Sequence, residues 1–158
     1  MIFTLATFTL VHVVISLVGI GSGLVVAIGL VRGKRLDGWT VIFLTTTVAT
    51  SVSGYGFPFE HLLPSHIVGA ISLLVLAVAI FARYGRRLAG GWRRVYVIAA
   101  VVALYLNVFV LVVQLFRRVP ALEALAPTQS EPPFAIAQFV VLALFIGIGA
   151  KAAIGFRG

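Results

Sequence analysis

The chain has 158 residues, of which 61% are hydrophobic and only 10% charged, with a formal net charge of +8 and no cysteine. A soluble domain carries about 25% charged residues, so these proportions exclude an ordinary water-soluble fold and predict a protein embedded in lipid. The lack of cysteine excludes disulfides, thiolate metal sites and thiol catalysis.

Five apolar stretches are long enough to form transmembrane helices, because a bilayer core about 30 Å thick needs roughly 20 helical residues. In chain order we expect them over residues 3–31, 39–57, 65–84, 94–116 and 134–156. Each stretch is continuous rather than alternating, which disfavours barrel strands. The sequence therefore predicts an all-α fold, with residues 1–158 forming one transmembrane bundle of five helices.

The first stretch has neither a basic segment before it nor a small-residue cleavage site after it. We therefore interpret it as a retained helix and not as a signal peptide.

The loops differ sharply in charge, and this difference predicts the orientation. Ten of the twelve basic residues lie at or near the helix ends expected on one side of the membrane: Arg32, Lys34, Arg35, Arg83, Arg86, Arg87, Arg93, Arg94, Lys151 and Arg157. Arg117 and Arg118 lie on the other side. Short loops rich in Lys and Arg stay in the cytoplasm, so we expect the N-terminus outside and the C-terminus inside a bacterial-type inner (plasma) membrane.

The high positive charge could also suggest nucleic-acid binding, but the basic residues lie at predicted helix ends and not on a soluble face. We therefore predict no nucleic-acid partner. Membrane lipids are the expected surroundings, with anionic headgroups attracted to the cytoplasmic face by about 1 kcal/mol per basic residue.

The first predicted helix carries a small and polar stripe. His12, Ser16, Gly19 and Gly23 follow one another at steps of four, three and four residues and share a helix face. Such a face lets another helix or a flat ligand approach the backbone closely. Two readings stay open, namely a ligand-contacting histidine and plain helix packing in which His12 bonds to a neighbour.

A second group of candidates joins the second and third predicted helices. Glu60, His61 and His66 lie in a proline-stiffened segment, with His66 in the first turn of the third helix and Gly69 next to it on the same face. His66 thus repeats the pattern of the first helix, a histidine followed by a small residue. The alternative is a solvated turn whose histidines contact only water.

Amides complete the set of candidates. Asn107 and Gln114 share one face of the fourth predicted helix, and Gln138 lies one turn inside the fifth. Hydrogen bonding between helices is the alternative role. In the loop between these helices, Gln129 and Glu131 could fold over the bundle as a lid, or the loop is a solvated connector.

These polar residues gather toward the outer face: His12, Ser53, Glu60, His61, His66, Gln114, Glu131 and Gln138. A channel or ion pump needs polar groups through the whole membrane, so a one-sided cluster favours a pocket in the outer leaflet. Neutral imidazole is a good ligand for copper, zinc and haem iron. We expect a haem or metal site for a redox role, with His12, His61, His66 and Glu60 as possible metal ligands.

The two histidines and their small neighbours resemble the b-type cytochromes of membranes, which hold haem between transmembrane histidines. The resemblance implies haem b bound through His12 and His66, with small residues beside each to admit the porphyrin edge. We expect Ser16, Gly19, Gly69, Gln114 and Gln138 to complete the cofactor-binding pocket. The chain lacks the two histidine pairs of a two-haem protein, so at most one haem is expected.

Two further hypotheses stay open. A quinone could accept hydrogen bonds from His, Gln or Asn in the same pocket. The chain could instead be a non-catalytic accessory subunit of a larger membrane complex, docked to a membrane-protein partner or to further copies of itself. No nucleotide-binding or hydrolase motif is present, so the sequence does not decide whether the protein is an enzyme.

Overall fold

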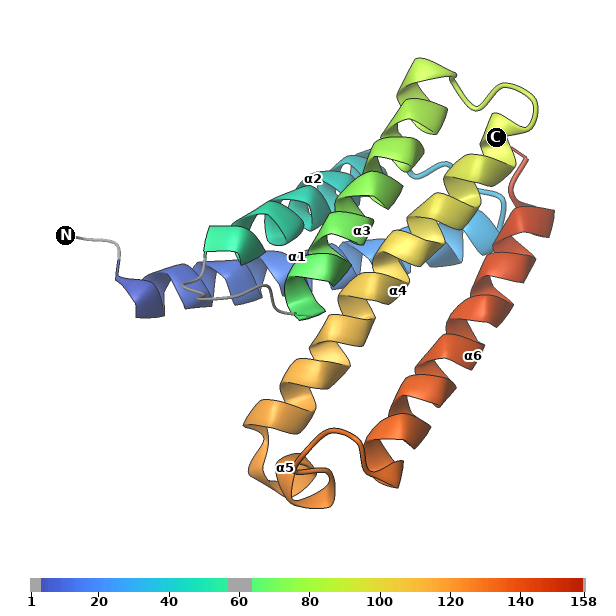
Figure 1. Cartoon of the computed structure of the whole chain (residues 1–158). Coiled ribbons are helices and arrows are strands. Elements are labelled where there is room, and N and C mark those ends of the chain that lie inside the picture. Colours follow the sequence, from blue (N-terminus) through green and yellow to red (C-terminus); the bar gives the residue numbers. More distant parts are fainter. Residues whose placement is uncertain (1–3, 57–63, 158) are drawn as a thin grey trace.

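The computed structural model describes residues 4–56 and 64–157 (Figure 1). The helices are α1 (Leu5–Val31), α2 (Asp37–Ser53), α3 (Pro64–Ile80), α4 (Trp92–Arg118), α5 (Pro120–Leu125) and α6 (Pro132–Gly155). A 3-10 turn, η1 (Gly54–Gly56), continues α2, and a π-helical turn, η2 (Phe81–Gly85), continues α3. These described residues contain no strand, which confirms the predicted all-α class.

Four stretches of the described helices are long and apolar enough to cross a bilayer. They are Ala6–Val31, His66–Gly85, Trp92–Arg118 and Pro132–Gly155, and each lies close to the range expected from the sequence. They indicate a protein embedded in a membrane. The shorter α2, with 17 residues, is not among them.

One end of the molecule gathers most of the charge. Asp37 at the start of α2 pairs with Arg83 of η2, and Arg93 Nη1 donates to the backbone oxygen of Arg157 at 3.3 Å. A side chain added at Gly33 would meet the Gly155 oxygen at 3.1 Å. We call this the basic end, formed by residues 32–37, 81–94 and 151–157.

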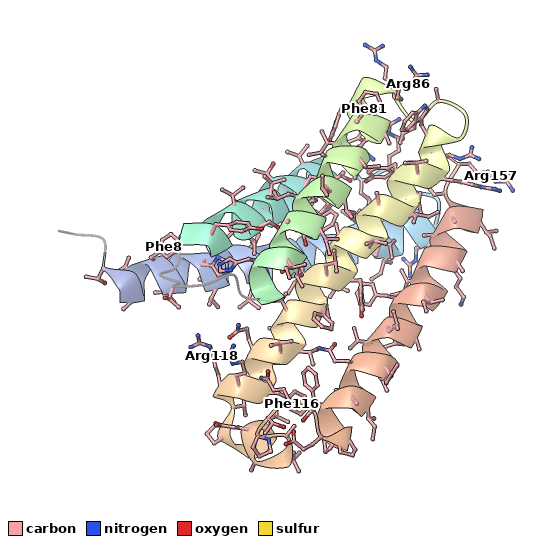
Figure 2. All side chains as sticks on the ribbon, viewed as in Figure 1. Phe8, Phe81, Arg86, Phe116, Arg118 and Arg157 are labelled. Carbon is pink, nitrogen blue, oxygen red and sulfur yellow. The ribbon has the colours of Figure 1, made fainter. Side chains whose placement is uncertain are left out.

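The helices diverge away from the basic end. In Figure 1 the N-terminal end of α1 and the hairpin of α4 and α6, closed by α5, point in clearly different directions. Figure 2 shows the same divergence, because Phe81, Arg86 and Arg157 lie toward one end while Phe8 and Phe116 are well separated from each other.

The main core lies in the half of the molecule nearer the basic end. Leu30, Phe43, Leu76, Tyr96 and Leu104 come from four helices, and each is at most 1% exposed. A smaller cluster of Val112, Phe116 and Ala126 forms where α5 and the following loop cover α4. Large apolar side chains elsewhere face outward, as expected of helices in contact with lipid; examples are Leu10, Leu74, Phe139 and Ile154.

Candidate functional site

His12 lies on the diverging half of α1 and is held by α2. Its Nδ1 lies 2.7 Å from the Ser53 hydroxyl, and that hydroxyl donates in turn to the Thr50 carbonyl at 3.1 Å. Because the Ser53 proton is engaged by Thr50, we infer that Nδ1 carries the imidazole proton and that the lone pair lies on Nε2. Metal-binding histidines are oriented in this way: the ring nitrogen that does not bind the metal donates its N–H to a neighbouring group.

His66 lies in the first turn of α3 and is only 5% exposed. The Tyr55 ring of η1 stacks on its imidazole, with ring centroids 5.3 Å apart and planes inclined by 23°. The Tyr55 hydroxyl also donates to the His66 backbone oxygen. Tyr55 therefore fixes both the ring and the backbone of His66.

The two histidines are held by one short segment. Ser53 bonds His12, Tyr55 stacks on His66, and a side chain added at the intervening Gly54 would come within 3.9 Å of His12 Cε1. The end of α2 thus brings together the contacts of α1 and α3.

Gly69 allows Tyr55 to lie flat against α3. A side chain added there would meet the hydroxyl oxygen and two ring carbons of Tyr55 at 3.2–3.4 Å. From the sequence, Gly69 next to His66 was expected to leave space for the edge of a ligand. In the described residues Tyr55 occupies that space.

Glu60 and His61, the other two predicted metal ligands, lie outside the described residues. Within residues 4–56 and 64–157 no group of three or more His, Asp or Glu side chains is placed to hold a metal ion. The four-residue metal site expected from the sequence therefore stays a prediction.

Ser16 and Gly19 form a second polar cluster, deeper in the bundle. Ser16 Oγ donates to Asn107 Oδ1 at 3.4 Å, linking α1 to α4. A side chain added at Gly19 would lie 3.2 Å from the hydroxyls of Thr46 and Thr47 and 3.3 Å from Asn107 Nδ2. The predicted small face of α1 is therefore used for close contact with α2 and α4.

Two atoms of this cluster are buried without a hydrogen-bond partner, namely Asn107 Nδ2 and Thr47 Oγ1. Buried polar groups are normally bonded, because an unbonded donor in an apolar medium costs free energy. Asn107 was a candidate from the sequence and Thr47 was not. Their convergence on Gly19 depends on how α1, α2 and α4 pack, which no single stretch of sequence encodes.

The two remaining site residues lie on the hairpin of α4 and α6. Gln138 Nε2 donates to the Phe109 oxygen at 3.3 Å, while Gln138 Oε1 is buried without a partner. Gln114 accepts from Arg118 Nε at 3.0 Å. The Gln138 bond thus joins α6 to α4, whereas the Gln114 bond stays within α4. The site expected from the sequence is divided between two regions.

The loop before α6 folds back onto this hairpin. Gln129 Nε2 donates to the Val113 oxygen at 3.2 Å, and Ala126 is fully buried. Glu131 accepts from the Thr128 hydroxyl at 2.7 Å and from the backbone nitrogens of Thr128 and Ser130. The Thr128 hydroxyl, followed by these amides, lowers the pKa of the Glu131 carboxyl. The loop covers the α4–α6 end of the molecule and not the histidines.

Comparisons with protein-family models, with curated proteins and with solved structures found no match to this chain. The function must therefore be argued from the residues and their contacts alone.

Proposed function

We propose that the protein is a five-span membrane protein of a bacterial-type inner membrane, with its N-terminus outside and its C-terminus in the cytoplasm. α2 and η1 together cover residues 37–56, and α2 alone rises about 25 Å at 1.5 Å per residue. α2 lies beside α1 along its length, which supports a fifth crossing (Figure 1). The meeting of both interhelical basic segments with the C-terminal segment at one end supports the odd number of crossings.

Its proposed role is to bind a redox-active metal centre, either haem iron or a single transition-metal ion, through His12 and His66. The observation that carries this proposal is the chain of hydrogen bonds from His12 Nδ1 to Ser53 and from Ser53 to the Thr50 carbonyl. It orients the imidazole of His12 through one ring nitrogen, as metal-binding histidines are oriented.

The residues present fit such a group in their chemistry. Imidazole nitrogen binds haem iron, copper and zinc. His12 of α1 and His66 of α3 both contact one segment, residues 53–55. Bound iron or copper would supply one-electron transfer. The protein would orient the ligands, keep His66 from water and surround the centre with an apolar shell.

The test is the absorption spectrum and metal content of the purified protein. We expect a Soret band or a bound transition metal in the unmodified protein and its loss in His12→Ala. Ser53→Ala should weaken binding by about 10–100-fold, as loss of a residue that orients a metal ligand does. Thr46→Val is the matched control, because the Thr46 hydroxyl also bonds to α2 carbonyls but lies about two turns away from Ser53 along the helix.

A colourless and metal-free protein, or binding that survives in His12→Ala, would contradict the proposal. In that case the unbonded Asn107 Nδ2 and Thr47 Oγ1 favour the second candidate, a quinone whose carbonyl oxygen accepts from them. Extraction of a quinone that co-purifies with the protein and is lost in Asn107→Leu would support that role.

The accessory-subunit hypothesis rests on α6, whose apolar side chains are the most exposed of the four long helices. Phe139 is 70% exposed and Ile154 is 77% exposed. Lipid alone can cover such a face, so this candidate requires a fixed partner that co-purifies with the chain.

A further inference from the structure

Arg83 is a buried cation at the basic end. The residue is only 2% exposed, although arginine is almost never buried without compensation. Its guanidinium lies over the Tyr96 ring of α4 at 5.1 Å and near the Tyr84 ring at 5.7 Å. Two of its nitrogens, Nε and Nη1, are buried without a hydrogen-bond partner.

Asp37 is the one anion paired with Arg83 among the described residues. Arg83 Nη2 donates to Asp37 Oδ1, and Arg35 Nε donates to the same oxygen at 3.2 Å. The Asp37 side chain is 70% exposed, whereas that of Arg83 is 1% exposed. The charged and titratable groups facing this pair are therefore Arg35 beside α2, Tyr84 of η2 and Tyr96 of α4. A buried cation thus depends on a carboxylate that water can reach.

The segment that carries Arg83 is strained. η2 is a π-helical turn, a form that occurs mostly as single turns at functional sites. Arg87 and Leu88, which follow it, both have left-handed backbones, with φ of +51° and +61°. Side chains other than glycine adopt this conformation only where the surrounding structure imposes it. The closed form of this segment is therefore maintained by its contacts.

We propose that Asp37 and Arg83 form a charge clasp that closes the basic end of the bundle. While Asp37 carries its negative charge, Arg83 stays between the tyrosines and η2 packs against α4. When that charge is removed, the guanidinium is left buried and uncompensated, so it turns out to water and η2 moves away from α4. The rest of the bundle, held by the apolar contacts deeper in the core, stays closed.

The chain has no cysteine, so one introduced thiol reports the opening. Ala82 in η2 and Ala103 in the middle of α4 are both fully buried. We would place Ala82→Cys or Ala103→Cys in the full chain in detergent and measure labelling by a water-soluble maleimide. In Asp37→Asn the thiol at position 82 should react at least about tenfold faster, because the buried Arg83 guanidinium then loses its counter-charge. The thiol at position 103 should stay protected.

Two further variants separate charge from shape. Arg35→Ala removes the exposed partner of the same carboxylate oxygen and should leave position 82 protected. Arg83→Met removes the buried charge, so adding Asp37→Asn to it should no longer expose position 82. This double variant keeps the test valid even if Asp37→Asn alone does not fold.

Unchanged labelling at position 82 in Asp37→Asn would overturn the clasp. Equal labelling at positions 82 and 103 would overturn it too, because the whole bundle would then have opened. Exposure of position 82 in the Asp37→Asn and Arg83→Met double variant would show that residue 37 acts through shape and not through charge.

Discussion

His12 and His66 illustrate how two similar residues in a sequence acquire different surroundings. Both precede a small residue on the same helix face, which made them equivalent candidates. His12 is bonded through Nδ1 to a hydroxyl, whereas His66 is stacked against Tyr55 and nearly buried. His12 is therefore the residue whose substitution tests the metal proposal most directly, because Ser53 orients its imidazole.

Two glycines of α1 give a matched test of close packing. A side chain at Gly19 would lie within 3.3 Å of atoms from Thr46, Thr47 and Asn107, whereas one at Gly21 would meet nothing within 4 Å. We expect Gly19→Ala to lower the free energy of unfolding by about 1–3 kcal/mol, as overpacking does. Gly21→Ala should change it by no more than about 1 kcal/mol, with a gain expected from helix propensity.

Thermal unfolding of the two variants in the same detergent measures this difference. Equal stability of Gly19→Ala and Gly21→Ala would contradict the packing of α1 against α2 and α4.

At the scale of elements, the Glu131 carboxylate holds the loop that leads into α6. It accepts from Thr128 and Ser130 of that loop and makes no side-chain capping bond to α6. Because these bonds lower its pKa below the ordinary value of 4.5, the folded state favours the charged form. The loop contacts of Glu131 therefore stabilise the fold above pH 4.5, and this contribution is lost as the pH falls through the lowered pKa.

We expect the stability of the unmodified protein to fall as the pH drops below about 4.5, the ordinary value for this carboxyl. Glu131→Gln should be less stable at neutral pH and should lose this part of the pH dependence. Unfolding followed at several pH values measures both effects. Glu123→Gln removes the same charge without changing these loop contacts, so a similar loss in that variant would argue against the role of Glu131.

The helices and their limits were largely predictable from the sequence, whereas the partners of their side chains were not. Apolar length and flanking charge predict where α1, α3, α4 and α6 lie, because the membrane imposes both features. The pairing of Ser53 with His12, or of Tyr55 with His66, depends on the rotation of each helix. Neither residue carries a sequence signal for that rotation, and Tyr55 was not among the candidates.

The separation of the glutamines from the histidines follows from the same limit. Expected depth alone placed Gln114 and Gln138 beside His12 and His66, since all four were assigned to the outer half of the membrane. Depth gives no lateral position. Gln138 bonds to Phe109 of α4 and Gln114 to Arg118, whereas His12 bonds to Ser53 and His66 stacks on Tyr55.

For the whole molecule, the orientation can be tested with the same cysteine-free chain. Arg86 and Glu123 are both exposed, and they lie at the basic end and on α5 respectively. In intact cells, an impermeant thiol reagent added outside should label Glu123→Cys and not Arg86→Cys, because short basic loops stay in the cytoplasm. Both should react after the membrane is permeabilised. The reverse pattern would overturn the proposed topology.

The divergence of the helices bears on how this protein meets its bilayer. The protein is narrow at the basic end and broad where α1 and the α4–α6 hairpin separate. It therefore occupies more area in one leaflet than in the other. Lipids around such a cone pack with the least strain where the membrane bends toward the narrow side. We therefore expect the protein to favour curved regions of a bilayer over flat ones.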